Sequence, residues 1–259
     1  ALIYPRTIIF LINSGKDFCV AMNLKNYNIQ NNNTAIDRDK TKIVFMFDDG
    51  WRSVYSEAYS LMKEYSYKES VSIIPSLIVE DEYMSYKELA ELYLEGWDLL
   101  NHSYSHRADA YNNTDELLSD FDKSRRWMDN RYFGKCSDMV VMPHGEINPY
   151  LIRQLKNAGY RSVRTSDNII VLDSFNYYYY PITSINPVTN ISANEVTAQL
   201  KQGINELKTF VLIFHKIGYE DDEFGMTYNK DMLKQIIMFI DRHSDKFQVL
   251  TYSQLDFNK

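Results

Sequence analysis

The stretch KIVFMFDDG at residues 42–50 decides the fold of this chain of 259 residues. Its five consecutive apolar residues, 43–47, form a short apolar run with the length of a strand. Two aspartates and a glycine follow directly, so polar groups stand where the strand ends. A helical pattern follows at residues 54–65, so this strand opens a series in which strands and helices alternate.

Apolar runs and helical patterns alternate after this first strand. Further strands are predicted at residues 70–74, 97–100, 139–142, 161–165, 209–214 and 247–251, and helices at 54–65, 86–95, 114–129, 149–157, 193–207 and 230–242. Gly96 and Gly159 are stop signals behind two of these helices, and Thr114 is predicted to cap another. The pattern predicts an α/β protein with about seven parallel strands in a closed or nearly closed barrel. An open doubly wound sheet is the alternative, although no glycine-rich phosphate loop follows the first strand.

Composition excludes several classes of protein. A content of 45% apolar and 14% aromatic residues excludes intrinsic disorder, and 9 Gly and 2 Cys exclude collagen-like chains and disulfide scaffolds. The formal charge of −7 argues against nucleic acid as a partner, and no apolar run is long enough to predict a transmembrane span. Cys19 and Cys136 are interpreted as two buried free thiols, with a single bridge as the alternative.

Residues 1–40 differ from the rest of the chain. Residues 8–12 and 18–22 are predicted to form short strands, and the Asn-rich stretch 23–33 a surface loop. We therefore expect a short N-terminal β appendage over residues 1–40 and the barrel domain over residues 41–259. Because the chain begins with Ala1 and shows no apolar core of a signal peptide, we expect a processed product or a part of a longer chain or surface assembly.

Polar residues gather at the predicted carboxyl ends of the strands, namely Asp48, Asp49, His102 and His215. Barrel enzymes carry their active sites on this face. Two adjacent carboxylates cannot both point into the same space, so one can bind a metal ion while its neighbour stays a free base. A solvated turn is the alternative, since Asp-Gly pairs are common in turns.

The histidines carry the second part of the pattern. His102 and His106 are four residues apart, which on a helical turn places both imidazoles on one face, as two ligands of one metal ion require. Two surface histidines in a polar loop are the alternative. His215 ends the apolar run 211–214 and suits a general acid or, alternatively, a core histidine, whereas His144 and His243 are interpreted as a loop and a surface residue.

Four segments in this order resemble the polysaccharide deacetylase family (carbohydrate esterase family 4, the chitooligosaccharide deacetylase homology domain). They are Phe-Asp-Asp-Gly at 47–50, His-Ser-x-x-His at 102–106, Pro-His-Gly at 143–145 and Leu-Ile-Phe-His at 212–215. The resemblance covers about residues 42–255 and leaves the N-terminal appendage out. It implies a distorted (β/α) barrel, in agreement with the alternation of strands and helices.

The resemblance also implies a role for each residue of the predicted site. Asp49, His102 and His106 would be the ligands of one divalent transition metal, with zinc expected and cobalt, nickel or manganese as alternatives. Asp48 would be the general base, and His215 the general acid that protonates the leaving group.

Further residues are expected around the substrate. The backbone N–H of His144 would donate to the oxyanion, where many relatives have a tyrosine, and Ile213 would line the pocket for the acetyl methyl group. Trp51 and Tyr104 are candidates for stacking on the sugar, and so is the tyrosine run 177–180, unless this run is a half-buried strand.

The sequence departs from the family in two places. Many relatives have an arginine where this chain has Val141, and we expect Arg164, from the next strand, to supply the guanidinium instead. The family's additional aspartate motif is not plainly present, and Asp167 is a weak candidate for it.

The reaction implied is the metal-dependent hydrolysis of acetyl groups, N-acetyl in the first place, from an acetylated poly- or oligosaccharide outside the cell or at its surface. A metal-dependent hydrolase of another C–N bond, in an amide or a cyclic imide, is one alternative. A non-catalytic carbohydrate-binding protein on the same scaffold is the other.

Overall fold

The computed structural model describes residues 8–10, 20–22, 35–107, 113–187, 191–220, 225–255 and 257. The chain divides into two compact units, residues 1–35 and 36–259. In the first unit, β1 (Ile8–Phe10) pairs antiparallel with β2 (Val20–Met22). The predicted Asn-rich loop and Cys19 lie outside the described residues.

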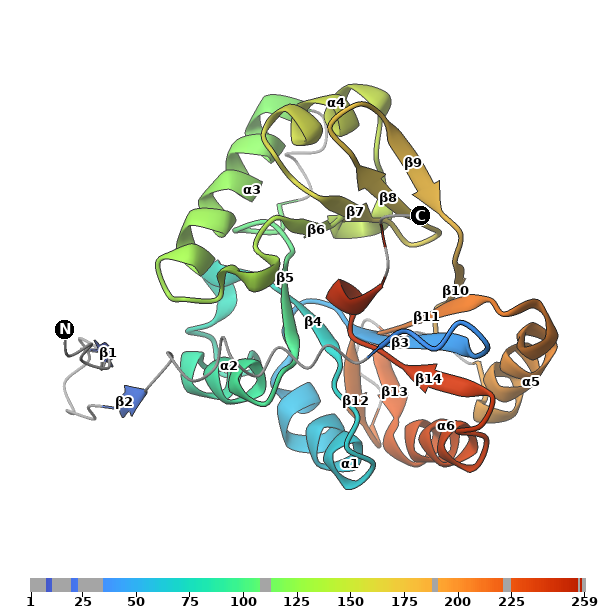
Figure 1. Ribbon diagram of the computed structural model, residues 1–259. Coiled ribbons are helices and arrows are strands. Elements are labelled where there is room, and N and C mark those ends of the chain that lie inside the picture. Colours follow the sequence, from blue (N-terminus) through green and yellow to red (C-terminus); the bar gives the residue numbers. More distant parts are fainter. Residues whose placement is uncertain are drawn as a thin grey trace, which may run out of the picture. The chain divides into compact units, whose positions relative to one another are not determined.

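A ten-stranded sheet forms the centre of the second unit (Figure 1). Its strands are β3 (Thr41–Phe47), β4 (Ser70–Ile73), β5 (Asp98–Asn101), β6 (Met139–Val141), β7 (Ser162–Arg164), β8 (Ile169–Leu172), β9 (Tyr177–Tyr180), β10 (Thr183–Ile185), β11 (Thr209–Phe214) and β14 (Phe247–Val249). Hydrogen-bonded neighbours follow the order β10-β11-β3-β4-β5-β6-β7-β8-β9, and β14 joins β3. All pairs are parallel except β7 with β8 and β8 with β9.

The two ends of this path, β9 and β10, follow one another in the chain with only Pro181 and Ile182 between them. Nine flat strands would span about 38 Å, because neighbours are about 4.8 Å apart. Two linking residues reach only about 10 Å. The sheet must therefore curl until its ends approach each other, as in a distorted barrel, although no ladder joins β9 to β10 in the part of the chain that the structure describes.

Burial on both faces explains the unbroken apolar run of β3, all of whose residues are buried. Val44 and Met46 pack in the barrel interior together with Ile213 of β11. Phe45 and Phe47 point the other way and stack on Phe214, with ring centroids 6.2 and 5.5 Å apart. Side chains of β3 therefore pack on both faces of the sheet, in the barrel interior on one face and below the helices on the other.

The helices lie on the outer side of the curved sheet (Figure 1). They are α1 (Tyr59–Glu64), which continues a π-helical turn at Val54–Ala58, α2 (Tyr86–Leu94), α3 (Thr114–Asp129), α4 (Pro149–Asn157), α5 (Ala193–Gly203) and α6 (Lys230–Arg242). The predicted cap of α3 at Thr114 is wrong: Asn113 precedes the helix, and its side chain accepts the N–H groups of Asp115 and Glu116. No helix among the described residues is long and apolar enough to cross a membrane.

Some elements were not predicted. These are β8, β10 and a small parallel pair, β12 (Lys216–Gly218) with β13 (Thr227–Asn229). The tyrosine run forms β9, in which exposed and half-buried side chains alternate, as the strand interpretation required. Cys136 is buried and free, as expected.

Candidate metal centre and catalytic residues

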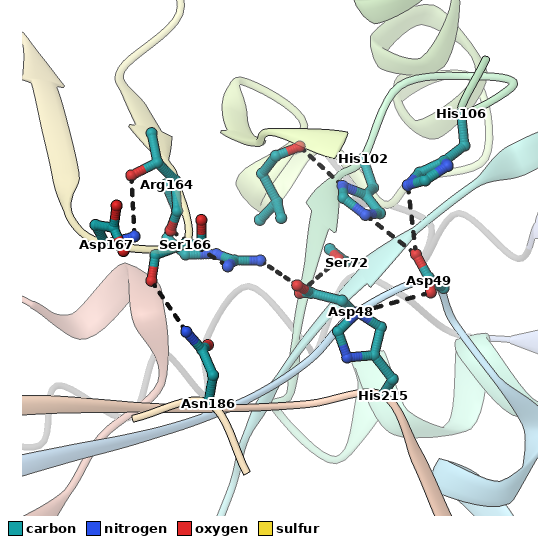
Figure 2. Close-up of polar contacts among 12 residues, drawn as sticks. Asp48, Asp49, Ser72, His102, His106, Arg164, Ser166, Asp167, Asn186 and His215 are labelled. Atoms are coloured by element: carbon teal, nitrogen blue, oxygen red, sulfur yellow. Dashed lines mark hydrogen bonds and ion pairs between the residues drawn. The ribbon is translucent and has the colours of Figure 1, made fainter. Parts of the chain in front are cut away.

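The predicted site residues meet at one edge of the sheet (Figure 2). Asp48 and Asp49 directly follow β3, His102 follows β5, and His215 follows β11. Parallel strands end on the same side of the sheet, and this side carries the site in barrel enzymes. Residues far apart in the sequence therefore become neighbours.

Asp49, His102 and His106 form the one group of three potential metal ligands found among the described residues. Asp49 Oδ1 lies 3.2 Å from His102 Nε2 and 3.7 Å from His106 Nε2, and the three ligand atoms are all within 4.8 Å of one another. Tetrahedral ligands about 2.0–2.2 Å from a zinc ion are about 3.3 Å apart, so these separations suit one ion. Two imidazoles and a carboxylate are also a donor set that divalent transition metals accept.

The tautomer of His102 fits such a role. Its Nδ1 lies 2.8 Å from the carbonyl oxygen of Val141. A carbonyl oxygen can only accept, so Nδ1 carries the hydrogen, and a neutral ring then directs the lone pair of Nε2 toward Asp49. Two atoms with lone pairs are stable at 3.2 Å only with a proton or a cation between them.

The electrostatics favour the protonation states that ligands need. Burial raises the pKa of Asp49, but the hydrogen bond and charge of His102, with the charges of His215 and His106, outweigh burial and hold the pKa well below its usual value. Burial, followed by the neighbouring His102, lowers the pKa of His106 to about 4, against the opposing charge of Asp49. An ionised carboxylate and a neutral imidazole are the forms that bind metal.

The spacing of His102 and His106 predicted a helical turn, and this prediction is wrong. Ser103 and His106 have φ angles of 62° and 50°, in the left-handed region, so the segment is a loop. Asn101 Oδ1 accepts the N–H of Ser103 at 3.1 Å, and Ser103 Oγ accepts the N–H of His106 at 3.0 Å. The ligands therefore meet because of local hydrogen bonds rather than helical periodicity.

A carboxylate of α3 fixes the same loop from outside. Asp120 Oδ2 accepts the N–H groups of Tyr104 and Ser105 at 3.0 and 2.9 Å, and the hydroxyl of Ser105 lies 3.0 Å from both oxygens. Sequence reasoning missed Asp120, because nothing in a helical pattern marks one acidic residue as a partner of a loop.

Asp48 has different partners from its neighbour. Its Oδ1 accepts the hydroxyl of Ser72 at 3.0 Å, and its Oδ2 forms a buried ion pair with Nη2 of Arg164 (Figure 2). Burial raises the pKa of Asp48, but the charge of Arg164, followed by those of His102 and His215, lowers it below its usual value. Asp48 is therefore ionised at neutral pH. The predicted set did not include Ser72, which is a fully buried polar residue of β4.

Arg164 lies where the departure at Val141 led us to expect it. The two residues are paired in the register of β6 and β7, so their side chains leave the sheet on the same face. Arg164 is 2% exposed, and its Nη1 donates to the carbonyl oxygen of Thr165 at 3.3 Å. The guanidinium thus reaches Asp48 from the strand next to the expected one.

His215 and His144 complete the surroundings of the donor set. His215 Nε2 is 3.9 Å from Asp49 Oδ2, and its buried Nδ1 has no hydrogen-bond partner among the described residues. The weak candidate Asp167 is exposed in the turn after β7 and donates its N–H to Thr165, so it is not a partner of His215. His144 is exposed, has a φ of 54°, and its ring lies 4.7 Å from that of His106.

The predicted sugar-stacking role of Trp51 does not hold. Its ring is 8% exposed, stacks on Tyr83 with centroids 4.3 Å apart, and has Lys216 Nζ 3.9 Å from its centroid. Both contacts are too close to share one side of the ring, so both faces are covered. Its indole N–H donates to Asp49 Oδ2 at 3.0 Å instead.

The other substrate candidates remain predictions. Tyr104 is half-buried, and Lys123 Nζ lies 3.7 Å from its ring centroid, so one face of the ring is covered. Ile213 is 2% exposed and lies within the interior cluster, two residues before His215.

Fold and site together define an α/β domain with a candidate metal centre at the carboxyl ends of its parallel strands. Residues 35–163 match the family model named polysaccharide deacetylase. A poly-β-1,6-N-acetyl-D-glucosamine N-deacetylase of Staphylococcus aureus (strain MRSA252) is 26% identical over 156 residues, which are 55% of this chain and 53% of that protein. The chain thus spans about half the length of the curated relatives it matches.

Solved structures share the fold over most of the chain. The Xyl-CE4 domain of a multidomain xylanase from the hindgut metagenome of Trinervitermes trinervoides has a TM-score of 0.57 at 18% identity, over 83% of this chain and 89% of that one. Peptidoglycan deacetylase PdaC from Bacillus subtilis has a TM-score of 0.55 at 18% identity, over 85% of this chain and 92% of that one. The chain belongs to the polysaccharide deacetylase family, carbohydrate esterase family 4.

Proposed function

We propose that the chain is a metal-dependent deacetylase that hydrolyses N-acetyl groups of a poly- or oligosaccharide. One observation carries the proposal: an ionised, buried Asp48 stands beside the separate donor set of Asp49, His102 and His106. Hydrolysis needs a base and an electrophilic centre side by side, and two adjacent aspartates with different partners provide for both.

Asp49, His102 and His106 would hold a divalent transition metal, zinc in the first place and cobalt, nickel or manganese as alternatives. Such an ion supplies Lewis acidity, which polarises an acetyl carbonyl and makes water more acidic. The carboxylate of Asp48 would take the proton from the attacking water, while Arg164 and Ser72 hold that carboxylate in place.

The remaining steps fall to two histidines. His215 would give a proton to the departing amine, whose nitrogen cannot leave as an anion. The backbone N–H of His144 would donate to the developing oxyanion, a contact that contributes about 10²–10³ in rate in enzymes of this kind. The ring of His144 lies 4.7 Å from that of His106, a contact that supports this role.

The substrate class follows from the relatives. The Staphylococcus aureus protein is named for poly-β-1,6-N-acetyl-D-glucosamine, and PdaC for peptidoglycan. We therefore propose an acetylated amino-sugar polymer outside the cell or at its surface as the substrate of this chain.

The decisive experiment combines metal analysis with acetate release from N-acetylglucosamine oligomers of β-1,6 linkage and from peptidoglycan fragments. Wild type should contain about one divalent ion and release acetate, Asp48→Asn should keep the ion but lose activity, and His102→Ala should lose both. A fully active Asp48→Asn variant would contradict the assignment of the base. Hydrolysis of a cyclic imide without acetate release would identify the other C–N hydrolase, and oligosaccharide binding without metal or turnover would identify a binding protein.

A further inference from the structure

We infer that Trp51 is a positioning residue that sets the orientation of the Asp49 carboxylate and thereby the metal affinity of the site. This inference rests on the proposed function, because it assumes that Asp49, His102 and His106 bind an ion.

The two oxygens of Asp49 have different neighbours. Oδ1 faces the Nε2 atoms of His102 and His106, whereas Oδ2 accepts the indole N–H of Trp51 at 3.0 Å. The hydrogen bond is buried, and both side chains are at most 10% exposed. An indole N–H can only donate, so Trp51 holds the second oxygen without competing for an ion.

The indole is held from both sides. Tyr83 stacks on one face at an interplanar angle of 23°, and an isolated antiparallel bridge joins the backbones of Trp51 and Tyr83. Lys216, which follows His215 in the chain, covers the other face with its ammonium group. Three separate segments thus fix the position of one N–H group.

Without the N–H of Trp51, the carboxylate of Asp49 has His215 as another partner within reach. His215 Nε2 is 3.9 Å from Asp49 Oδ2, so a rotated Asp49 would turn toward His215 and away from the two other ligands. Partners that orient a metal ligand in this way typically change metal affinity by about 10–100-fold.

The test is a titration of the metal-free full chain with cobalt(II), followed by the visible d–d absorption of the bound ion. Trp51→Phe removes the N–H and keeps an aromatic ring, and we expect the Kd to rise about 10–100-fold, with an altered d–d spectrum. Trp127→Phe, the same change at a half-buried tryptophan on α3, should leave both unchanged. Circular dichroism checks that each variant is folded.

A second variant keeps the test valid if Trp51→Phe does not fold. Trp51→benzothienylalanine, introduced by suppression of a stop codon, replaces only the N–H by sulfur, and the same rise in Kd is expected. A folded variant with the Kd and spectrum of wild type would overturn the inference alone, provided that His102→Ala abolishes binding. A wild type that binds no cobalt would overturn the inference together with the proposed metal centre.

Discussion

At the scale of single residues, the site depends on the different surroundings of two adjacent aspartates. Asp49 lies at a φ of 72°, in the left-handed region, so the extended backbone of β3 ends between Asp48 and Asp49. Asp48 consequently meets a guanidinium and a hydroxyl, while Asp49 meets imidazoles and an indole. One dipeptide can thus provide a base and a ligand without competition between them.

The buried pair of Asp48 and Arg164 gives the first prediction. Arg164→Met leaves the buried carboxylate without a compensating charge, and we expect a loss of about 3–5 kcal/mol in the free energy of unfolding. Deacetylation should also fall, because the base loses its orientation. Urea unfolding and acetate release measure the two effects, and an unchanged variant would contradict the role given to Arg164.

A second substitution provides the matched control. Val141 and Arg164 are paired across β6 and β7, so Val141→Arg in the Arg164→Val background moves the guanidinium one strand over on the same face. We expect this double variant to recover part of the stability and of the activity that Arg164→Val loses. Recovery would separate loss of the charge from general damage to the interior.

At the scale of elements, α3 fixes the loop of residues 102–106, which carries His102 and His106, through the side chain of Asp120. Asp120→Ala removes both acceptor oxygens, so the N–H groups of Tyr104 and Ser105 lose their partner. We expect faster hydrogen exchange over residues 102–106 and a metal affinity reduced by about 10–100-fold. Asp122→Ala is the control, since Asp122 lies on the same helix but accepts the hydroxyl of Tyr160 at 2.8 Å. Equal effects of the two variants would show that the helix, rather than the contact, matters.

The elements also show what the sequence could predict. The run at β3 and the one at β11 were recognisable because strands buried on both faces are apolar throughout. The short strands β8 and β10 could not be predicted, because three or four residues carry no periodic signal. In addition, β8 pairs antiparallel with β7 and so interrupts the parallel pattern.

The sequence could predict which residues belong to the candidate site, but not how they are arranged. The order of the motifs predicted Asp48, Asp49 and the histidines, and in the register of β6 and β7 Arg164 is the partner of Val141. The spacing of four between His102 and His106 led to a helix, although left-handed residues and a contact with Asp120, from a helix that begins later in the chain, form a loop instead. The burial of Trp51 depends on Tyr83 and Lys216, whose approach no local pattern indicates.

At the scale of the whole molecule, a buried acid limits stability as the pH rises. Glu69, directly before β4, is fully buried. Burial raises its pKa well above the usual value, and a weaker hydrogen bond from the backbone of Phe45 opposes this shift. Between the unfolded pKa of about 4.3 and the raised folded pKa, the folded state binds more protons. The stability that this group contributes is therefore present below about pH 4 and is lost as the pH rises.

Glu69→Gln cannot ionise, so its free energy of unfolding should decline less from pH 5 to pH 8 than that of wild type, by more than about 1 kcal/mol. Urea unfolding at several pH values gives the comparison. The same change at the exposed Glu206 should leave the wild-type slope intact. Parallel pH profiles for wild type and Glu69→Gln would refute the argument.

The position of β3 has a consequence for the time course of folding. This strand is made early in the chain, yet β11 and β14 pair with it from about 170 and 200 residues further on, and the N–H of Asp48 donates to the carbonyl oxygen of Phe214. Contacts over such sequence separations form slowly. During synthesis, β3 can pair early with β4, but its positions that pair with β11 and β14 stay uncovered until nearly the whole chain has left the ribosome, a state that favours aggregation. The buried ion pair between Asp48 and Arg164 must wait as well, because its two residues are 116 positions apart in the chain.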